Sequence, residues 1–301
     1  MKNLYKKIIR RFPYVSSLYE QSLQSSAPNG HFYSPVFSIQ DVRNRESQIW
    51  KNSSIDGIQG VDLKADEQFA LVKEFENYYK EMPFTAVKDS HQRYYFINSY
   101  YSYTDAIMLY SMIRHFKPKQ IIEIGSGFSS MLMLDTNELF FENQIKCTFI
   151  EPYPKRLLSL MKDSDKSLNT IIESDIQNIS LDIFEKLESG DILFVDSTHV
   201  SKTGSDVNYI LFEILPILKT GVLIHFHDIF YPFEYPKEWV FRGVNWNENF
   251  LLRAFLMYNQ QFEIILFTRY LLDLHASNFN NMPLCLQSTN SSSSSFWIRK
   301  K

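Results

Sequence analysis

The sequence predicts an α/β fold, in which a mainly parallel β-sheet is covered by helices on both faces. From residue 117 onward, short and nearly continuous apolar runs alternate with amphipathic segments of helical period. This alternation is typical of parallel strands buried between two helical layers. Residues 21–60, in contrast, are rich in Ser, Asn, Gln, Gly and Pro and show no sustained period. We therefore expect an irregular and helical N-terminal cap over residues 1–110 and a ligand-binding α/β domain over residues 111–301.

Two helices are expected before the sheet begins. An acidic start followed by apolar residues at helical spacing predicts a helix over residues 66–79. A second helix should begin at Ser102 or Thr104 and end at His115. Asp105 in its first turn and a basic residue near its end both suit the helix dipole.

The alternating region predicts a strand–helix series. Strands are expected over residues 120–125, 147–152, 169–175, 191–197, 221–230 and 262–268, with a last strand near Leu284–Gln287 or Ser295–Ile298. Helices are expected over residues 129–140, 154–161, 180–189, 205–219 and 247–259. The serine run at residues 291–295 is interpreted as a solvent-exposed loop.

Composition and charge exclude several classes of protein. The formal net charge of −3 over 301 residues gives no basic field for non-specific nucleic-acid binding. The two cysteines cannot form a disulfide framework, and no apolar run reaches the roughly 18 residues of a membrane helix. The basic N-terminus lacks the features of a signal peptide, and we interpret it as a packing helix rather than a membrane-surface anchor. A cytoplasmic protein without an integral membrane segment is expected, with its oligomeric state open, homodimer included.

The stretch IIEIGSGFSS suggests a ligand site at the end of the first strand. Gly125 and Gly127 would let a ligand pass close to the backbone, but alone they fit a phosphate, a nucleoside or plain packing. Glu123 precedes the turn, where it could accept from an amine or fix the loop. Glu151 ends the second strand, where an acid commonly binds ribose hydroxyls. Asp175 ends the third strand, where its carboxylate could meet the exocyclic amine of an adenine.

These residues resemble the first motif of class I S-adenosylmethionine-dependent methyltransferases, which reads Glu/Asp-x-Gly-x-Gly. The resemblance implies a Rossmann-like, seven-stranded sheet of order 3-2-1-4-5-7-6 and S-adenosyl-L-methionine as the cofactor. It also implies that Glu123 and the glycine loop hold the methionine moiety, Glu151 the ribose and Asp175 the adenine. The cofactor-binding residues expected in full are Glu123, Gly125, Ser126, Gly127, Ser129, Glu151, Asp175, Ile176 and Asp196. Nicotinamide-dependent oxidoreductases more often lack an acid at Glu123 and keep a third glycine, where this chain has Ser130.

A second set of polar residues follows strands four and five. In the sheet order that the resemblance implies, Asp196 and Asp228 should converge beside the donor. Two carboxylates aimed at one spot repel unless a cation or a shared proton lies between them, and Mg²⁺ or another divalent metal favours such a pair. His199, three residues after Asp196, could take the acceptor proton. The catalytic residues expected are therefore His199, Asp196 and Asp228.

The pattern Asp-x-x-His after strand four resembles the macrocin O-methyltransferase group, whose members are metal-assisted sugar O-methyltransferases. That group has an acidic pair after strand five, whereas this chain has His227 before Asp228. Since imidazole is a poor Mg²⁺ ligand, His227 is either a ligand beside Asp196 and Asp228, the base, or a neighbouring group. The other five histidines, His225 among them, are expected to be core or loop residues.

Aromatic residues after strand five suggest an acceptor pocket. Tyr235, Trp239 and Trp246 could offer flat faces to a sugar or aromatic acceptor, or could equally pack the following helix onto the sheet. The segment NSYYSYTDA before the core is expected to cover the donor, with Tyr100, Tyr103 and Asp105 as candidate contacts.

The function expected is methyl transfer from S-adenosylmethionine to a hydroxyl of a sugar, glycan or small natural product, with His199 as the candidate base. A nicotinamide-dependent oxidoreductase and a non-catalytic S-adenosylmethionine-binding module are the alternatives. The acceptor itself is left open, because its pocket is built from loops.

Overall fold

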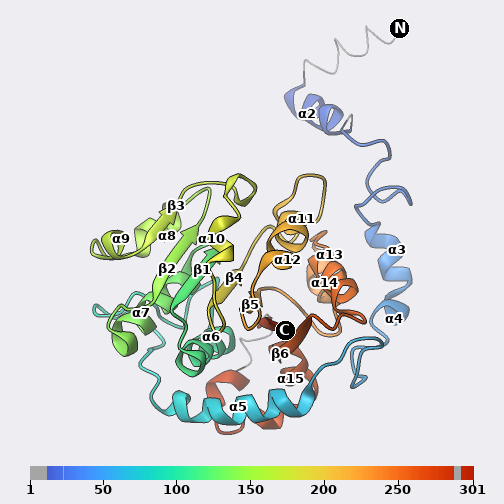
Figure 1. Ribbon diagram of the computed structural model, residues 1–301. Coiled ribbons are helices and arrows are strands. Elements are labelled where there is room, and N and C mark those ends of the chain that lie inside the picture. The colour runs from blue at the N-terminus through green and yellow to red at the C-terminus, as the bar shows by residue number, and fades with distance from the viewer. Residues whose placement is uncertain (1–11, 23, 288–292) are drawn as a thin grey trace, which may run out of the picture. The chain divides into compact units, whose positions relative to one another are not determined.

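The computed structural model describes residues 12–22, 24–287 and 293–301 (Figure 1). Its α-helices are α2 Pro13–Ser22, α3 Ile39–Asn44, α4 Glu46–Ile49, α5 Ala65–Lys80, α6 Tyr103–Phe116, α7 Phe128–Phe141, α8 Lys155–Leu160, α9 Asp165–Leu168, α10 Asp182–Glu185, α11 Asp206–Tyr209, α12 Leu215–Ile217, α13 Lys237–Phe241, α14 Glu248–Leu256 and α15 Thr268–Leu274. Its strands are β1 Gln120–Ile124, β2 Lys146–Ile150, β3 Thr170–Ile172, β4 Ile192–Val195, β5 Leu223–Phe226, β6 Phe262–Phe267 and β7 Phe296–Lys300. Among these described residues, no helix combines the length and apolar character that crossing a membrane requires.

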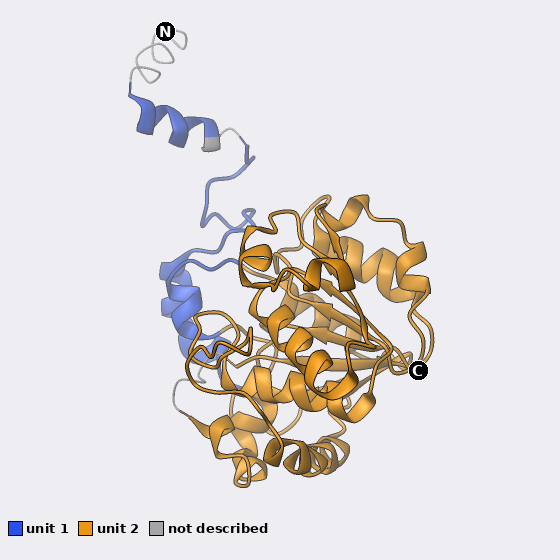
Figure 2. Cartoon of the chain, turned by 90° about the vertical axis from the view of Figure 1, so that its left-hand side faces the viewer, with its two compact units in different colours: residues 1–52, 236–245 blue, residues 53–235, 246–301 orange. Residues whose placement is uncertain are grey.

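The chain forms two compact units, which Figure 2 colours separately. Unit 1 consists of residues 1–52 and 236–245, and unit 2 of residues 53–235 and 246–301. Within unit 1, Nζ of Lys237 lies 2.6 Å from Oε1 of Glu46, and the rings of Trp50 and Phe241 pack edge to face. Helix α5 and the start of α6 belong to the same unit as the sheet. The division at residue 110 between cap and methyltransferase-like domain stays a prediction.

The sheet in unit 2 has the order β3-β2-β1-β4-β5-β7-β6, which confirms the expected topology. The pairs among β1 to β5 are parallel, whereas β7 runs antiparallel to both β5 and β6. Helices flank the sheet on both faces (Figure 1). Of the two positions considered for a last strand, the later one forms β7, and residues 283–286 form a short 3₁₀ helix instead.

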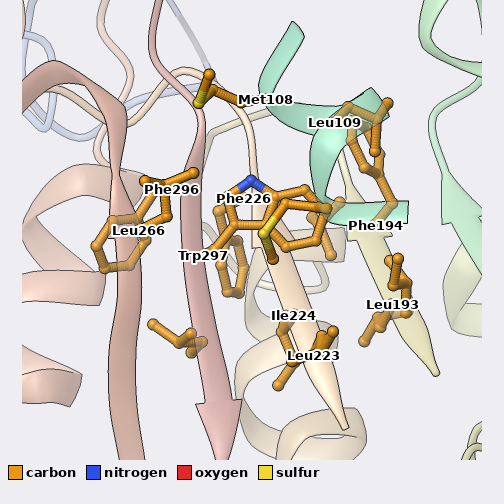
Figure 3. Packing of buried hydrophobic residues seen from close by; sticks show 14 of the residues in the cluster. Met108, Leu109, Leu193, Phe194, Leu223, Ile224, Phe226, Leu266, Phe296 and Trp297 are labelled. Carbon is orange, nitrogen blue, oxygen red and sulfur yellow. The ribbon is translucent and has the colours of Figure 1, made fainter. Parts of the chain in front are cut away.

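Part of the hydrophobic core packs around β4, β5 and β7 (Figure 3). Phe194, Phe226 and Trp297 are fully buried there. His225 belongs to the same core, because its ring stacks on Phe194 with centroids 3.9 Å apart. Burial holds the pKa of His225 well below its usual value. The expectation of a core histidine is therefore confirmed at this position.

Strand register brings the polar residues to one edge of the sheet. Ile124 of β1 pairs with Val195 of β4, and Val195 pairs with Phe226 of β5. On the other side of β1, Ile124 pairs with Ile150 of β2. The residues that follow these four strand ends all belong to the sequence motifs, namely Gly125, Asp196, His227 and Glu151. Since carboxyl ends of parallel strands in such sheets form ligand sites, the register places the site.

Candidate active site

A pocket of about 370 Å³ opens at the carboxyl ends of β1, β2 and β4. Five of the predicted cofactor residues line it: Gly125, Glu151, Asp175, Ile176 and Asp196. The other four, Glu123, Ser126, Gly127 and Ser129, lie in β1 or in the turn that leads into α7. The strand order therefore gathers residues that are separated by up to 71 positions in the sequence into one cavity.

Glycine is required at position 125 because the residues that follow β1 and β4 approach each other closely. Its φ of +80° lies in the left-handed region, and a Cβ there would lie 1.8 Å from the carbonyl oxygen of Asp196. Backbone hydrogen bonds continue the strand pairing here, from Gly125 N to Ile150 O at 3.0 Å and from Asp196 N to Ile124 O at 2.9 Å. Gly127 differs, because its backbone is extended and a Cβ would meet only the side chain of Arg156, at 3.5 Å or more. Packing therefore requires glycine at position 125, whereas packing alone would also permit a side chain at position 127.

Glu123 is fully buried and fixes the glycine turn. Its two carboxylate oxygens accept hydrogen bonds from the hydroxyls of Ser129, at 2.5 Å, and Ser130. Burial raises the pKa of Glu123 to about 8, although the serine hydrogen bonds act in the opposite direction. Of the two roles considered for this acid, the contacts support the one in which it holds the loop.

Glu151 also organises the turn, but from the pocket side. Its carboxylate accepts from the backbone N–H of Ser126 at 3.2 Å and of Tyr153 at 2.8 Å. Across the pocket, Ile176 is buried and Asp175 is exposed. An exposed carboxylate beside a buried aliphatic side chain offers one hydrogen-bond acceptor and one apolar face, which suits the edge and face of a purine.

Asp196, His199 and Asp228 form a compact cluster next to this pocket. Nε2 of His199 lies 3.3 Å from Oδ1 of Asp196 and 3.7 Å from Oδ2 of Asp228. One ligand atom from each residue lies within 4.8 Å of the others. Asp196 belongs to both places, since it lines the pocket and contacts His199.

The backbone of this cluster is strained at two residues. His199 has φ +60° and Asp228 has φ +58°, values that side-chain-bearing residues seldom adopt. Such conformations cost of order 1–3 kcal/mol each and persist where the surroundings enforce them, often at functional sites. Backbone N–H groups of Asn247 and Glu248 both donate to the carbonyl oxygen of His199, which holds it in this conformation.

The charges in the cluster are strongly coupled. For His199, burial acts to lower the pKa, but the carboxylates of Asp196 and Glu248 outweigh it, so the pKa lies well above its usual value. Desolvation acts to raise the pKa of Asp196, but nearby His227 and His199 hold it below its usual value. Desolvation raises the pKa of Asp228 despite the same two histidines. The carboxylates and the imidazoles of the cluster therefore stabilise one another's charged forms.

His227, the third ligand that the sequence suggested, lies next to the cluster, and its role as a ligand stays a prediction. Side chains alternate along a strand, and His227 lies on the same side as His225, with ring centroids 5.8 Å apart. Its ring also contacts Tyr101 at 5.2 Å. Nε2 of His227 lies 3.7 Å from Oδ1 of Asp228, so it contacts the cluster at its edge. Among the described residues, the geometry favours His199 over His227 as the third potential ligand.

Sequence reasoning missed Glu248, which completes the cluster. Its Oε2 lies 2.8 Å from Nδ1 of His199, and its side chain is 1% exposed. Glu248 is the first residue of α14, so the sequence explains it as an ordinary acidic helix start. The only signal available was that this acid stands in the aromatic segment WNENF, beside Trp246.

Sequence comparison assigns the family. The family model of a methyltransferase domain matches residues 122–229, from β1 to just beyond β5. An uncharacterized protein of Archaeoglobus fulgidus is 32% identical over 167 residues, which span 54% of this chain and 73% of the relative. The chain belongs to the class I S-adenosylmethionine-dependent methyltransferases.

Solved methyltransferase structures are also similar to this one. PaMTH1 of Podospora anserina, bound to S-adenosylhomocysteine (SAH), aligns with a TM-score of 0.42 and 16% identity over 92% of this chain and 99% of its own. TomG, an O-methyltransferase of Streptomyces achromogenes in complex with S-adenosylmethionine, aligns with a TM-score of 0.41 and 13% identity over 85% and 96%. Because both scores are below 0.5, the assignment of the family rests on the sequence matches and the strand order.

Two of the three predicted acceptor residues of this methyltransferase, Tyr235 and Trp246, lie together beside the cluster. The ring of Trp246 lies over His199, with centroids 4.3 Å apart. Tyr235 is 2% exposed and packs against Phe230 and Trp246, so its burial supports the packing alternative. Trp239 belongs to α13 in unit 1, whereas the other two belong to unit 2.

Proposed function

We propose that this methyltransferase transfers a methyl group to a hydroxyl oxygen of a sugar, glycan or small natural-product acceptor, with assistance from a divalent metal. The observation that supports the proposal is that Asp196 belongs to both the pocket and the cluster. It lines the pocket, and its Oδ1 contacts His199. An acceptor next to the cluster would therefore lie beside the donor, as an in-line transfer requires.

The donor pocket has a group for each part of S-adenosylmethionine. In this proposal Glu151 accepts from the ribose hydroxyls, and Asp175 and Ile176 hold the adenine at its edge and face. The turn fixed by Glu123 would carry the methionine end. When bound, the sulfonium supplies an electrophilic methyl group, so the protein's task is to align the acceptor and to remove its proton.

The cluster fits a divalent metal by charge and by ligand type. Carboxylates of Asp196 and Asp228 would hold it, and the imidazole of His199 favours Mn²⁺ or another transition metal over Mg²⁺. A bound cation would offset the charge of the two carboxylates and lower the pKa of an acceptor hydroxyl beside it.

His199 is the candidate base. Its Nε2 faces the space between the two carboxylates, and an ionised Glu248 at Nδ1 would orient the ring and stabilise the imidazolium that forms. The other role that this geometry permits is direct ligation of the metal by Nε2. The variant His199→Ala distinguishes the two roles. It should keep its Mn²⁺ affinity if His199 is the base, and lose it if His199 is a metal ligand.

Calorimetry with SAH tests the donor site, where we expect tight, saturable binding and no competition by NAD. Lack of SAH binding would refute the proposal. Transfer of labelled methyl groups to a panel of sugars, glycans and phenols then tests the acceptor class. On the acceptor found, Asp196→Ala and His199→Ala should abolish turnover. Turnover that survives both changes would contradict the catalytic assignment.

A further inference from the structure

The end of the serine run lies in the protein interior. Ser293, Ser294 and Ser295 are at most 3% exposed, so the expected solvent-exposed loop is wrong for these three residues, and Ser291 and Ser292 lie outside the described residues. The reason is the register of β7. It runs antiparallel to β5 and pairs Phe296 with Phe226, which brings the residues before Phe296 to the carboxyl end of β5, beside Asp228.

Asp105 holds this segment from the other side. It lies in the first turn of α6 and is 5% exposed. Its Oδ1 accepts three hydrogen bonds, from the hydroxyl of Ser293 at 2.8 Å and from the backbone N–H groups of Ser294 at 3.0 Å and Ser295 at 2.9 Å. A buried carboxylate with three donors on one oxygen fixes the backbone of the segment.

Ser294 connects this segment to the cluster. Its hydroxyl donates to Oδ1 of Asp228 at 2.9 Å, and its carbonyl oxygen accepts from the backbone N–H of Ile229 at 3.1 Å. Ser294 therefore contacts both the side chain of Asp228 and the peptide N–H that follows it. The other carboxylate oxygen, Oδ2, is the one that lies 3.7 Å from Nε2 of His199.

We infer that Ser294, held by Asp105, is a positioning residue for Asp228. By binding Oδ1, Ser294 fixes the rotation of the carboxylate and directs Oδ2 into the cluster. Partners that orient a metal-binding carboxylate in this way commonly contribute 10- to 100-fold to metal affinity. The inference rests on the metal site of the proposed function. It also gives α6, which precedes the methyltransferase motifs, a role in the site that differs from the donor contact expected of Asp105.

The variant Ser294→Ala tests the inference, with Ser293→Ala as its matched control. Both variants remove one buried hydroxyl from the same segment, but only Ser294 contacts Asp228. Mn²⁺ binding is measured by electron paramagnetic resonance with SAH present, and SAH binding by calorimetry. We expect Ser294→Ala to weaken Mn²⁺ binding at least 10-fold, Ser293→Ala to change it less than threefold, and SAH affinity to stay within twofold in both. Urea unfolding of both variants checks that the fold is equally stable.

Three results would overturn the inference. Mn²⁺ affinity within twofold of wild type in Ser294→Ala would show that the hydroxyl does not position the carboxylate. Equal losses in both variants would indicate a general loosening of the segment. Wild-type protein that binds SAH but no Mn²⁺ would refute the metal site and this inference together, whereas wild-type protein that binds no SAH would refute the proposed donor site.

Discussion

Glu248 contacts the ring of His199 at the nitrogen that faces away from the cluster, with Oε2 2.8 Å from Nδ1. This contact orients Nε2 toward Asp196 and Asp228. Glu248→Gln should therefore lower kcat by about 10- to 100-fold, with little change in KM or in SAH affinity. Steady-state kinetics on the acceptor found above checks it. The control is Glu263→Gln, which changes a carboxylate on β6 that pairs with Arg299 on β7. Equal kcat values in the two variants would contradict the role of Glu248.

We expect Arg156 to bind the carboxylate of the donor's methionine end. Its guanidinium carbon lies 3.8 Å from the ring centroid of Tyr100, and its Cδ lies 3.5 Å from the position that a Cβ on Gly127 would take. Across residues 12–22, 24–287 and 293–301, no ion pair involves Arg156. Arg156→Ala should weaken SAH binding about 10- to 100-fold, since a hydrogen-bonded charge contributes about 1.5–3 kcal/mol.

The binding of 5′-methylthioadenosine makes that prediction specific, because this compound lacks the amino-acid carboxylate. Its affinity should stay within twofold in Arg156→Ala. Lys155→Ala, a change at the neighbouring exposed cation, should alter neither affinity. If calorimetry shows equal losses for SAH and for 5′-methylthioadenosine, Arg156 acts on the pocket as a whole and not on the carboxylate.

The two glycines of the turn should respond differently to alanine. Gly125→Ala should lower the free energy of unfolding by at least about 2 kcal/mol, because left-handed strain adds to a clash with the backbone of Asp196. At Gly127 the backbone is extended and a Cβ would only make ordinary van der Waals contact with Arg156, so Gly127→Ala should change it by less than about 1 kcal/mol. Urea denaturation measures both values. A Gly125→Ala variant as stable as wild type would mean that residue 125 and the carbonyl oxygen of Asp196 do not approach each other closely.

Glu123 should make stability fall as the pH rises. Its pKa is raised by burial to about 8 in the folded protein, against about 4.3 in an unfolded chain. Between these values the folded state binds more protons than the unfolded state. The contribution to stability is thus complete below about pH 4 and is lost as the pH rises through 8, at up to about 1.4 kcal/mol per pH unit.

Glu123→Gln removes this dependence, so its stability should change less than that of wild type between pH 5 and pH 8. Urea unfolding at pH 5, 6.5 and 8 compares the two proteins. Parallel pH profiles would contradict a buried, proton-binding Glu123.

Local pattern alone predicted much of the fold. Apolar runs and amphipathic segments indicated the order of strands and helices, and α5 at Ala65–Lys80 lies within a residue of its expected bounds. The strand order followed from the motif Glu123-x-Gly125-x-Gly127 through its family resemblance, and is confirmed. The last strand could not be placed uniquely, because residues 284–287 and 295–298 are both short apolar runs of the same type.

The candidate site divides in the same way. The apolar runs indicated which residues end the parallel strands, and hence the acids Glu151 and Asp196 and the turn between β1 and α7. The distant side chains that join them became known only from the three-dimensional fold. Glu248 reaches His199 across 49 residues and Ser294 reaches Asp228 across 66. Residues on one strand follow a local period, but contacts between strands and loops depend on register and on strand direction, which no local pattern contains.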